Sequence, residues 1–135
     1  NNPQSLINKI HKKLSASQVY ALFTQPVYSL EAAEFLLTHL ERYNAQQGTA
    51  CALILGFFPV MSYKGAIFLR DKLPGVYIPN EWVQKLEKAH NVGVEEEKKV
   101  GLDISLNLFN ALKTLHNKFH FMSAKPSLFK AFVRG

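Results

Sequence analysis

The residues best suited to chemistry lie where short apolar runs end in polar or proline-containing segments. Gln25 follows the run Val19–Phe23, and its side-chain amide offers one acceptor and two donors. Such an amide suits the edge of a heterocycle that displays both kinds of group, because the polar atoms of the ring then find partners. A glutamine at this point can equally satisfy the backbone of its own loop.

The five histidines form no pattern typical of a metal or catalytic site. His116 and His120 are four residues apart, but they straddle an expected helix end and an expected strand, which spoils the same-face geometry of a two-histidine metal pair. The sequence has no glycine-rich phosphate loop and no Gly-x-Ser-x-Gly elbow. We therefore expect neither a metal site nor a catalytic residue within this chain.

The charge of the chain is basic, with 16 Lys and Arg against 10 Asp and Glu and a formal net charge of +6. This charge suits an anionic partner such as a phosphorylated small molecule, although net charge concerns steering more than identity. Lys13 lies on the polar side of an amphipathic segment, where a lysine either meets a phosphate or stays solvated. Because the lysines are dispersed and the aromatic residues follow core spacings, we expect no nucleic-acid partner.

Length and composition indicate one folded domain. The chain has 135 residues, of which 47% are hydrophobic, and this supplies enough apolar surface for folding. The longest apolar stretch, Cys51–Phe58, is far too short to cross a bilayer, and no signal peptide is readable, so we expect no membrane association. Cys51 is the single cysteine, which favours a reducing, cytoplasmic setting.

Hydrophobic periodicity predicts helices that alternate with three short strands. The strands are expected over Val19–Thr24, Ala50–Phe57 and Phe119–Met122. The helices are expected over Ser5–Leu14, from the cap Ser29 to about Gln46, from the cap Ser62 to Lys72, from the cap Asn80 onward, over Glu95–Leu115 and over Pro126–Val133.

This order of elements predicts an α/β fold with a parallel sheet. Strands separated by helices run parallel with right-handed crossovers, and their unbroken apolar runs indicate burial on both faces. Three parallel strands leave two open edges with unpaired amides and carbonyls. We therefore expect the sheet to continue into another polypeptide segment or into an assembly.

Three segments carry a resemblance to a known family. Thr24–Glu31, Ile54–Lys64 and Leu73–Pro79 resemble, in order and spacing, motifs in the C-terminal half of methylenetetrahydrofolate reductases. The closest form looks like the one fused to a homocysteine S-methyltransferase. Glu97–Leu115 and Phe119–Lys125 resemble the penultimate helix and the last strand of that family. The resemblance covers nearly the whole chain.

The resemblance implies a (β/α)8 TIM barrel, of which residues 1–135 would be a single partial domain holding the last three βα units. It also implies a flavoprotein that passes a hydride from a reduced nicotinamide through FAD to 5,10-methylenetetrahydrofolate. Alone, the chain is expected to be incomplete, not to retain FAD, and to need the missing N-terminal half or to self-associate. The alternative is a non-catalytic half-barrel remnant or a pterin- or flavin-binding module.

Site residues follow from the resemblance position by position. Gln25 matches the glutamine that contacts the folate pterin, Phe23 matches an apolar residue beside the flavin, and Lys13 matches a lysine near the FAD phosphates.

The chain also departs from the pattern of the family at three places. A second site glutamine falls on Gly65, a nearby aromatic residue falls on Leu69, and the substrate-binding arginine falls on Lys125 or Pro126. A lysine cannot reproduce the planar, bidentate grip of arginine on a carboxylate. The resemblance therefore implies a folate site with an altered rim, in which Lys125 is the remaining cation.

Overall fold

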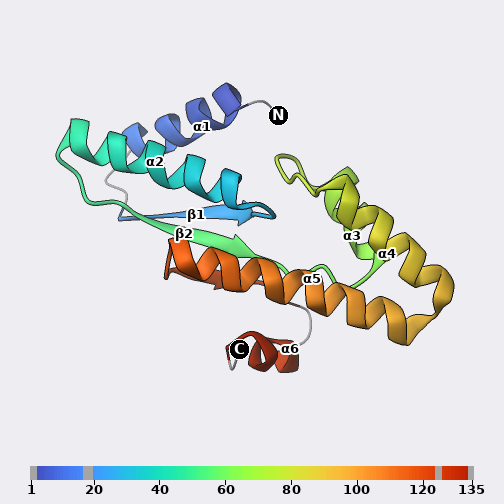
Figure 1. Cartoon of the computed structure of the whole chain (residues 1–135). Helices are drawn as coiled ribbons and strands as arrows, with labels where there is room; N and C mark the ends of the chain where they lie inside the picture. The colour runs from blue at the N-terminus through green and yellow to red at the C-terminus, as the bar shows by residue number, and fades with distance from the viewer. Residues whose placement is uncertain (1–2, 17–19, 124–125, 134–135) are drawn as a thin grey trace.

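The molecule is built on a small three-stranded parallel sheet with helices packed beside it (Figure 1). The computed structural model describes residues 3–16, 20–123 and 126–133. In chain order its elements are α1 (Pro3–Ala16), β1 (Ala21–Pro26), α2 (Leu30–Gln47), β2 (Ala52–Phe57), α3 (Tyr63–Lys72), α4 (Asn80–Val92), α5 (Val94–Leu115), β3 (Phe119–Phe121) and α6 (Pro126–Val133). Within these ranges no helix is both long and apolar enough to cross a bilayer.

The three strands pair in sequence order and run parallel. Leu22 of β1 lies opposite Leu53 of β2, and Gly56 of β2 lies opposite His120 of β3. The register between β1 and β2 shifts after Phe23. The predicted α/β class, parallel direction and strand order are confirmed.

Helix boundaries follow the predicted caps in two of three cases. The Ser29 side chain accepts from the Ala32 N–H at 3.1 Å, and the Ser62 side chain accepts from the Gly65 N–H at 2.9 Å. The prediction that Asn80 caps α4 is wrong. Pro79 holds the cap position, where its carbonyl accepts the first helical N–H groups, and Asn80 is already helical.

One face of the sheet is covered. Leu53, Leu55 and Phe57 of β2 are buried on this face beneath α2 and α5. The Phe57 ring packs against Phe109 of α5 at a centroid distance of 4.8 Å and against Phe132 of α6 at 5.5 Å. Because side chains alternate along a strand, these three residues point to the same side and form the core with the helices.

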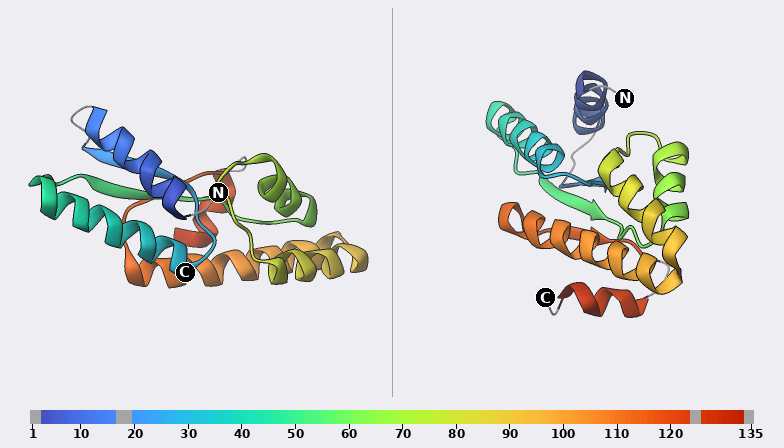
Figure 2. Two further views of the ribbon diagram at one scale, coloured as in Figure 1. Left: turned by 90° about the horizontal axis from the view of Figure 1, so that it is seen from above. Right: turned by 45° about the vertical axis from the view of Figure 1, so that its right-hand side comes forward.

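The opposite face of the sheet is largely uncovered, as Figure 2 shows by the position of α2 and α5 along a single side. The Phe23 side chain is 59% exposed, His120 is exposed and Ile54 is only partly buried. The prediction of burial on both faces is therefore wrong for this chain. The physical reason is that α2, α5 and α6 pack on the same side, and the described residues place no helix over the other.

Candidate functional site

The carboxyl ends of the three strands meet at one edge of the sheet, where ligands bind in parallel α/β folds. Backbone hydrogen bonds join the segments just beyond these ends. The Val27 N–H donates to the Gly56 carbonyl at 3.2 Å, and the Met122 N–H donates to the Phe57 carbonyl at 2.8 Å. The chain thus brings the predicted strand-end segments together.

Gln25 lies at this edge, at the end of β1. Its side chain is exposed and makes no hydrogen bond to any other described residue, whereas its carbonyl accepts from the Thr24 hydroxyl at 2.8 Å. The same hydroxyl accepts from the Gly56 N–H at 2.9 Å, which ties the end of β1 to β2. The backbone of Gln25 is therefore held in place while its amide remains available to a ligand.

Gly56 permits this close approach of β1 and β2. A Cβ atom at this position would lie 2.6 Å from the Thr24 carbonyl oxygen and 2.9 Å from the Met122 Cε. Any side chain would push the strand ends apart. The signal for this role was a glycine inside an apolar strand, a pattern typical of a close backbone contact.

Phe23 and His120 form an exposed aromatic pair across the uncovered face. Their ring centroids are 5.7 Å apart and nearly perpendicular, although Phe23 lies on β1 and His120 on β3. His120 follows Phe119 and precedes Phe121, so strand alternation places its side chain on the face opposite to theirs. Alternation along β3 indicates this orientation, but no local pattern indicates the pairing with Phe23, which lies on another strand.

Tyr28 links the loops after β1 and β2. Its hydroxyl donates to the Phe58 carbonyl at 2.9 Å, and its ring packs edge-on against Trp82 of α4. Burial raises the pKa of the Tyr28 hydroxyl well above its ordinary value, so the group stays neutral and acts as a donor. This contact fixes the two loops relative to one another beside the strand ends.

A buried carboxylate holds the start of α3. Glu97 of α5 accepts from the Tyr63 N–H at 2.8 Å and from the His90 Nδ1 of α4 at 3.2 Å. The backbone donor of Tyr63 and then the His90 side chain lower the pKa of the Glu97 carboxyl, although burial opposes them. The sequence offered Glu97 only as part of an acidic first helical turn, so this role was missed.

Two predicted site residues cannot be placed by their side chains. Lys13 falls in α1, in the part of the helix that leads toward the start of β1, but its side chain lies outside the described residues. Lys125 lies outside them altogether, and Pro126 is the first residue of α6. Their proposed contacts stay predictions.

The positions that depart from the family pattern have local structural roles. The Gly65 N–H donates to the capping hydroxyl of Ser62, in the first turn of α3. Leu69 is buried in the core beneath the same helix. An apolar side chain that faces the core is not available to a ligand at the strand ends.

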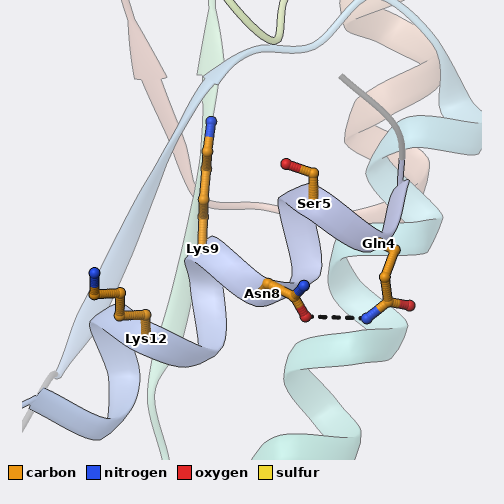
Figure 3. A pocket seen from close by; sticks show the side chains of 5 residues that line it. All are labelled: Gln4, Ser5, Asn8, Lys9 and Lys12. Carbon is orange, nitrogen blue, oxygen red and sulfur yellow. Dashed lines mark hydrogen bonds between the residues drawn. The ribbon is translucent and has the colours of Figure 1, made fainter.

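A shallow hollow lies along α1 (Figure 3). Its lining side chains all come from this one helix, and Gln4 donates to Asn8 at 3.0 Å. Side chains of a single helix cannot enclose a ligand, so we assign it no role. Elsewhere in the described ranges, no three His, Cys, Asp or Glu side chains are close enough to hold a metal ion.

The architecture defines the chain as a parallel α/β protein with a candidate ligand site at its strand ends. The sequence model of the methylenetetrahydrofolate reductase family matches residues 1–130, and the chain therefore belongs to that family. No curated protein sequence matches the chain.

One solved structure with the same fold is described as an uncharacterized protein from Clostridium thermocellum that binds two copies of 5-methyl-5,6,7,8-tetrahydrofolic acid. It aligns with a TM-score of 0.60 and 21% sequence identity, over 98% of this chain. The aligned part is 45% of the neighbour, so this chain spans less than half the length of that protein.

Proposed function

We propose that this chain is the C-terminal portion of a flavin-dependent methylenetetrahydrofolate reductase and supplies the last three βα units of a (β/α)8 barrel. Family membership and the parallel order β1-β2-β3 support this assignment. So does the uncovered face with Phe23, since the inner face of a barrel needs the remaining strands to cover it. The chain is incomplete on its own and acts with the missing N-terminal half. We assign the chain to the form of this enzyme that is fused to a homocysteine S-methyltransferase, which its strand-end motifs resemble.

The observation that carries the proposal is the state of Gln25. Its exposed amide has no partner among the described residues, while its backbone is fixed beside Gly56. We assign this amide to the polar edge of the folate pterin. The solved neighbour that binds 5-methyltetrahydrofolate supports a folate as the ligand class. A loop-satisfying glutamine, the alternative interpretation, would be expected to bond to its own loop.

The residues of the uncovered face fit one wall of a flavin site. Phe23 presents an exposed ring that His120 braces from the side, and such an apolar surface suits the plane of an isoalloxazine. When bound, FAD would supply hydride transfer between a reduced nicotinamide and the folate. In this assignment Phe23 would exclude water from one side of the flavin, and Lys13 would be the cation for its phosphates.

A second candidate function is a binding module without catalysis. The roles of Gly65 in capping and of Leu69 in the core favour it, because neither residue can offer the family's polar or aromatic contact. Lys125 would then be a weak anchor for a carboxylate. This module would bind a folate or a flavin but would not complete a hydride transfer.

The experiment compares two half-reactions in the full-length protein with Gln25→Leu. The change removes both donor and acceptor, so we expect folate turnover to fall about ten- to a hundredfold, since an unpaired buried polar group costs about 1–3 kcal/mol. Flavin reduction by the nicotinamide, which needs no pterin contact, should change less. Gln46→Leu, an exposed glutamine near the end of α2, is the matched control.

Three outcomes separate the interpretations. Equal losses in both half-reactions, or no loss in either, would contradict the role of Gln25. A wild-type protein that binds 5-methyltetrahydrofolate but never reduces its flavin would support the binding module instead. A wild-type protein with no affinity for either folate or flavin would contradict both.

A further inference from the structure

The loop after β2 runs along α5, and three residues of that helix touch it at intervals of four. Glu97 accepts from the Tyr63 N–H, Gly101 lies against the Met61 backbone, and Ser105 bonds to Val60. Residues four apart lie on one side of a helix, so the three contacts form a single line along α5. We call Glu97, Gly101 and Ser105 the α5 rail.

The contacts of the rail are close and directional. The Ser105 hydroxyl accepts from the Val60 N–H at 2.9 Å and donates to the Val60 carbonyl at 3.3 Å, and Ser105 is almost fully buried. A Cβ atom at Gly101 would lie 2.7 Å from the Met61 Cα, so the helix and the loop backbone are in direct contact. Satisfied buried groups of this kind hold a backbone in one position.

The carboxylate of Glu97 extends the rail to a third helix. A carboxylate only accepts, so His90 Nδ1 carries the proton of the 3.2 Å contact and α4 is tied to the same oxygen as the start of α3. Glu97 is 9% exposed, although its neighbours Glu95 and Glu96 are exposed. A buried carboxylate with two donors is therefore built into this position, in contrast to the solvated pair before it.

The loop held by the rail leads directly to the strand ends. Its first residue, Phe58, accepts from the Tyr28 hydroxyl, which fixes the loop after β1 as well. Two residues further back, Gly56 carries the contacts with Thr24 that hold the backbone of Gln25. A continuous set of contacts thus connects Glu97 and Ser105 on α5 with Gln25, the residue of β1 that we assign to folate binding.

We propose that Glu97 and Ser105 are positioning residues of the folate site. They hold the loop after β2 against α5 and so keep the strand ends around Gln25 in their binding geometry. This inference rests on the proposed function for the identity of the ligand. The anchoring of the loop by α5 does not depend on the proposed function, because this anchoring is measurable without any ligand.

The test uses the full-length protein with Glu97→Ala, Glu97→Gln and Ser105→Ala, and with Glu96→Gln as the exposed control in the same helical turn. Amide hydrogen exchange of peptides that cover residues 58–64 reports the anchoring. We expect about tenfold faster exchange in the two alanine variants, as the loss of one buried hydrogen bond allows. Glu97→Gln should lie between them and the wild type, because its amide oxygen still accepts from Tyr63.

The effect on the folate site is measured by the KM and the kcat of each variant, which report binding and turnover separately. In the alanine variants we expect the KM for methylenetetrahydrofolate to rise about tenfold, while kcat at saturating folate and the rate of flavin reduction change by less than about twofold. The conservative Glu97→Gln should recover part of the KM. A substitution that only destabilises the fold would instead raise exchange in α2 peptides as much as in the loop, and that result would contradict the inference.

Failure of the inference and failure of the proposed function give different results. Faster loop exchange with an unchanged KM would show that the rail does not position the site, while the folate function would stand. A wild-type protein that neither binds nor reduces folate would contradict the proposed function and with it this inference, whatever the loop exchange shows.

Discussion

The two faces of the β-sheet differ in what their side chains contact. On the covered face, Leu55 and Phe57 have no exposed surface and pack under α2, α5 and α6. On the uncovered face, Phe23 is mostly exposed, and its ring meets that of His120 nearly at a right angle. Both sets lie on strands only a few residues long, so the difference comes from where the helices pack and not from the composition of the strands.

The covered face stabilises the fold, whereas the uncovered face is available for recognition. Residues of the covered face become buried when this chain folds. Each buried aromatic side chain contributes several kcal/mol to the free energy of unfolding by burial and packing. Residues of the uncovered face gain little in this chain and remain available to another surface. An apolar, aromatic face that stays open in a folded chain typically marks a binding surface.

The largest expected effect is on the covered face. Phe57→Ala removes a ring that contacts Phe109, Phe121 and Phe132, and we expect the free energy of unfolding to fall by about 3–5 kcal/mol. Urea denaturation measures this loss. The control is Phe68→Ala on α3, where the side chain is 57% exposed, and a loss as small as in this control would contradict the account of the core.

A smaller effect is expected where the strands approach each other. Gly56→Ala forces a Cβ atom against the Thr24 carbonyl oxygen and the Met122 Cε, and we expect the free energy of unfolding to fall by about 1–3 kcal/mol from overpacking. Urea denaturation again measures the change. A variant as stable as the wild type would show that the ends of β1 and β2 relax easily, so that the backbone of Gln25 is not held in place.

The buried carboxylate predicts a dependence of stability on pH. The pKa of Glu97 is lowered in the folded chain, so its charge stabilises the fold above its unfolded pKa of about 4.3, and this contribution is lost as the pH falls through the folded pKa. We expect Glu97→Gln to be less stable than the wild type by about 1 kcal/mol at neutral pH, because a hydrogen bond to a charged acceptor is worth about that much more than one to a neutral acceptor. Below the folded pKa the two proteins should converge.

Urea denaturation at several pH values between neutral and acidic measures this difference. Glu96→Gln, in the same turn but exposed, should show no such convergence. A constant difference between Glu97→Gln and the wild type at every pH would contradict the assigned role of the charge.

The smallest effect on stability belongs to the uncovered face. Phe23→Ser should change the free energy of unfolding of the isolated chain by less than about 1 kcal/mol, because most of the ring is already in water. In the full-length protein the same change should lower the amount of flavin retained after gel filtration, measured by absorbance. A loss of stability as large as for Phe57→Ala would remove the distinction between the two faces.

Much of the fold was predictable from the sequence because its signals are local. The apolar runs around Leu22 and Leu55 predicted buried strands, and Ser29 and Ser62 marked helix starts through a hydrogen bond three residues away. The position of Gln25 at a strand end followed from Pro26, which ends β1. These features need only neighbouring residues.

The contacts around the site were not predictable because they join distant parts of the chain. Ser105 bonds to Val60, which is 45 residues away, and Glu97 bonds to Tyr63, 34 residues away. Which face of α5 meets the loop after β2 depends on how the helices pack, and no local pattern reports it. The same holds for the uncovered face, since an apolar run alone does not show on which side a strand is covered.

The most direct test of the central claim is a crystal structure of the full-length protein with 5-methyltetrahydrofolate. We predict that the pterin lies at the strand ends of this chain, with its polar edge bonded to the Gln25 amide, and that Phe23 and His120 are covered by the flavin or by the remaining strands. A structure in which the folate binds elsewhere, and in which Gln25 bonds to protein backbone instead, would contradict the assignment of the uncovered face as the ligand surface.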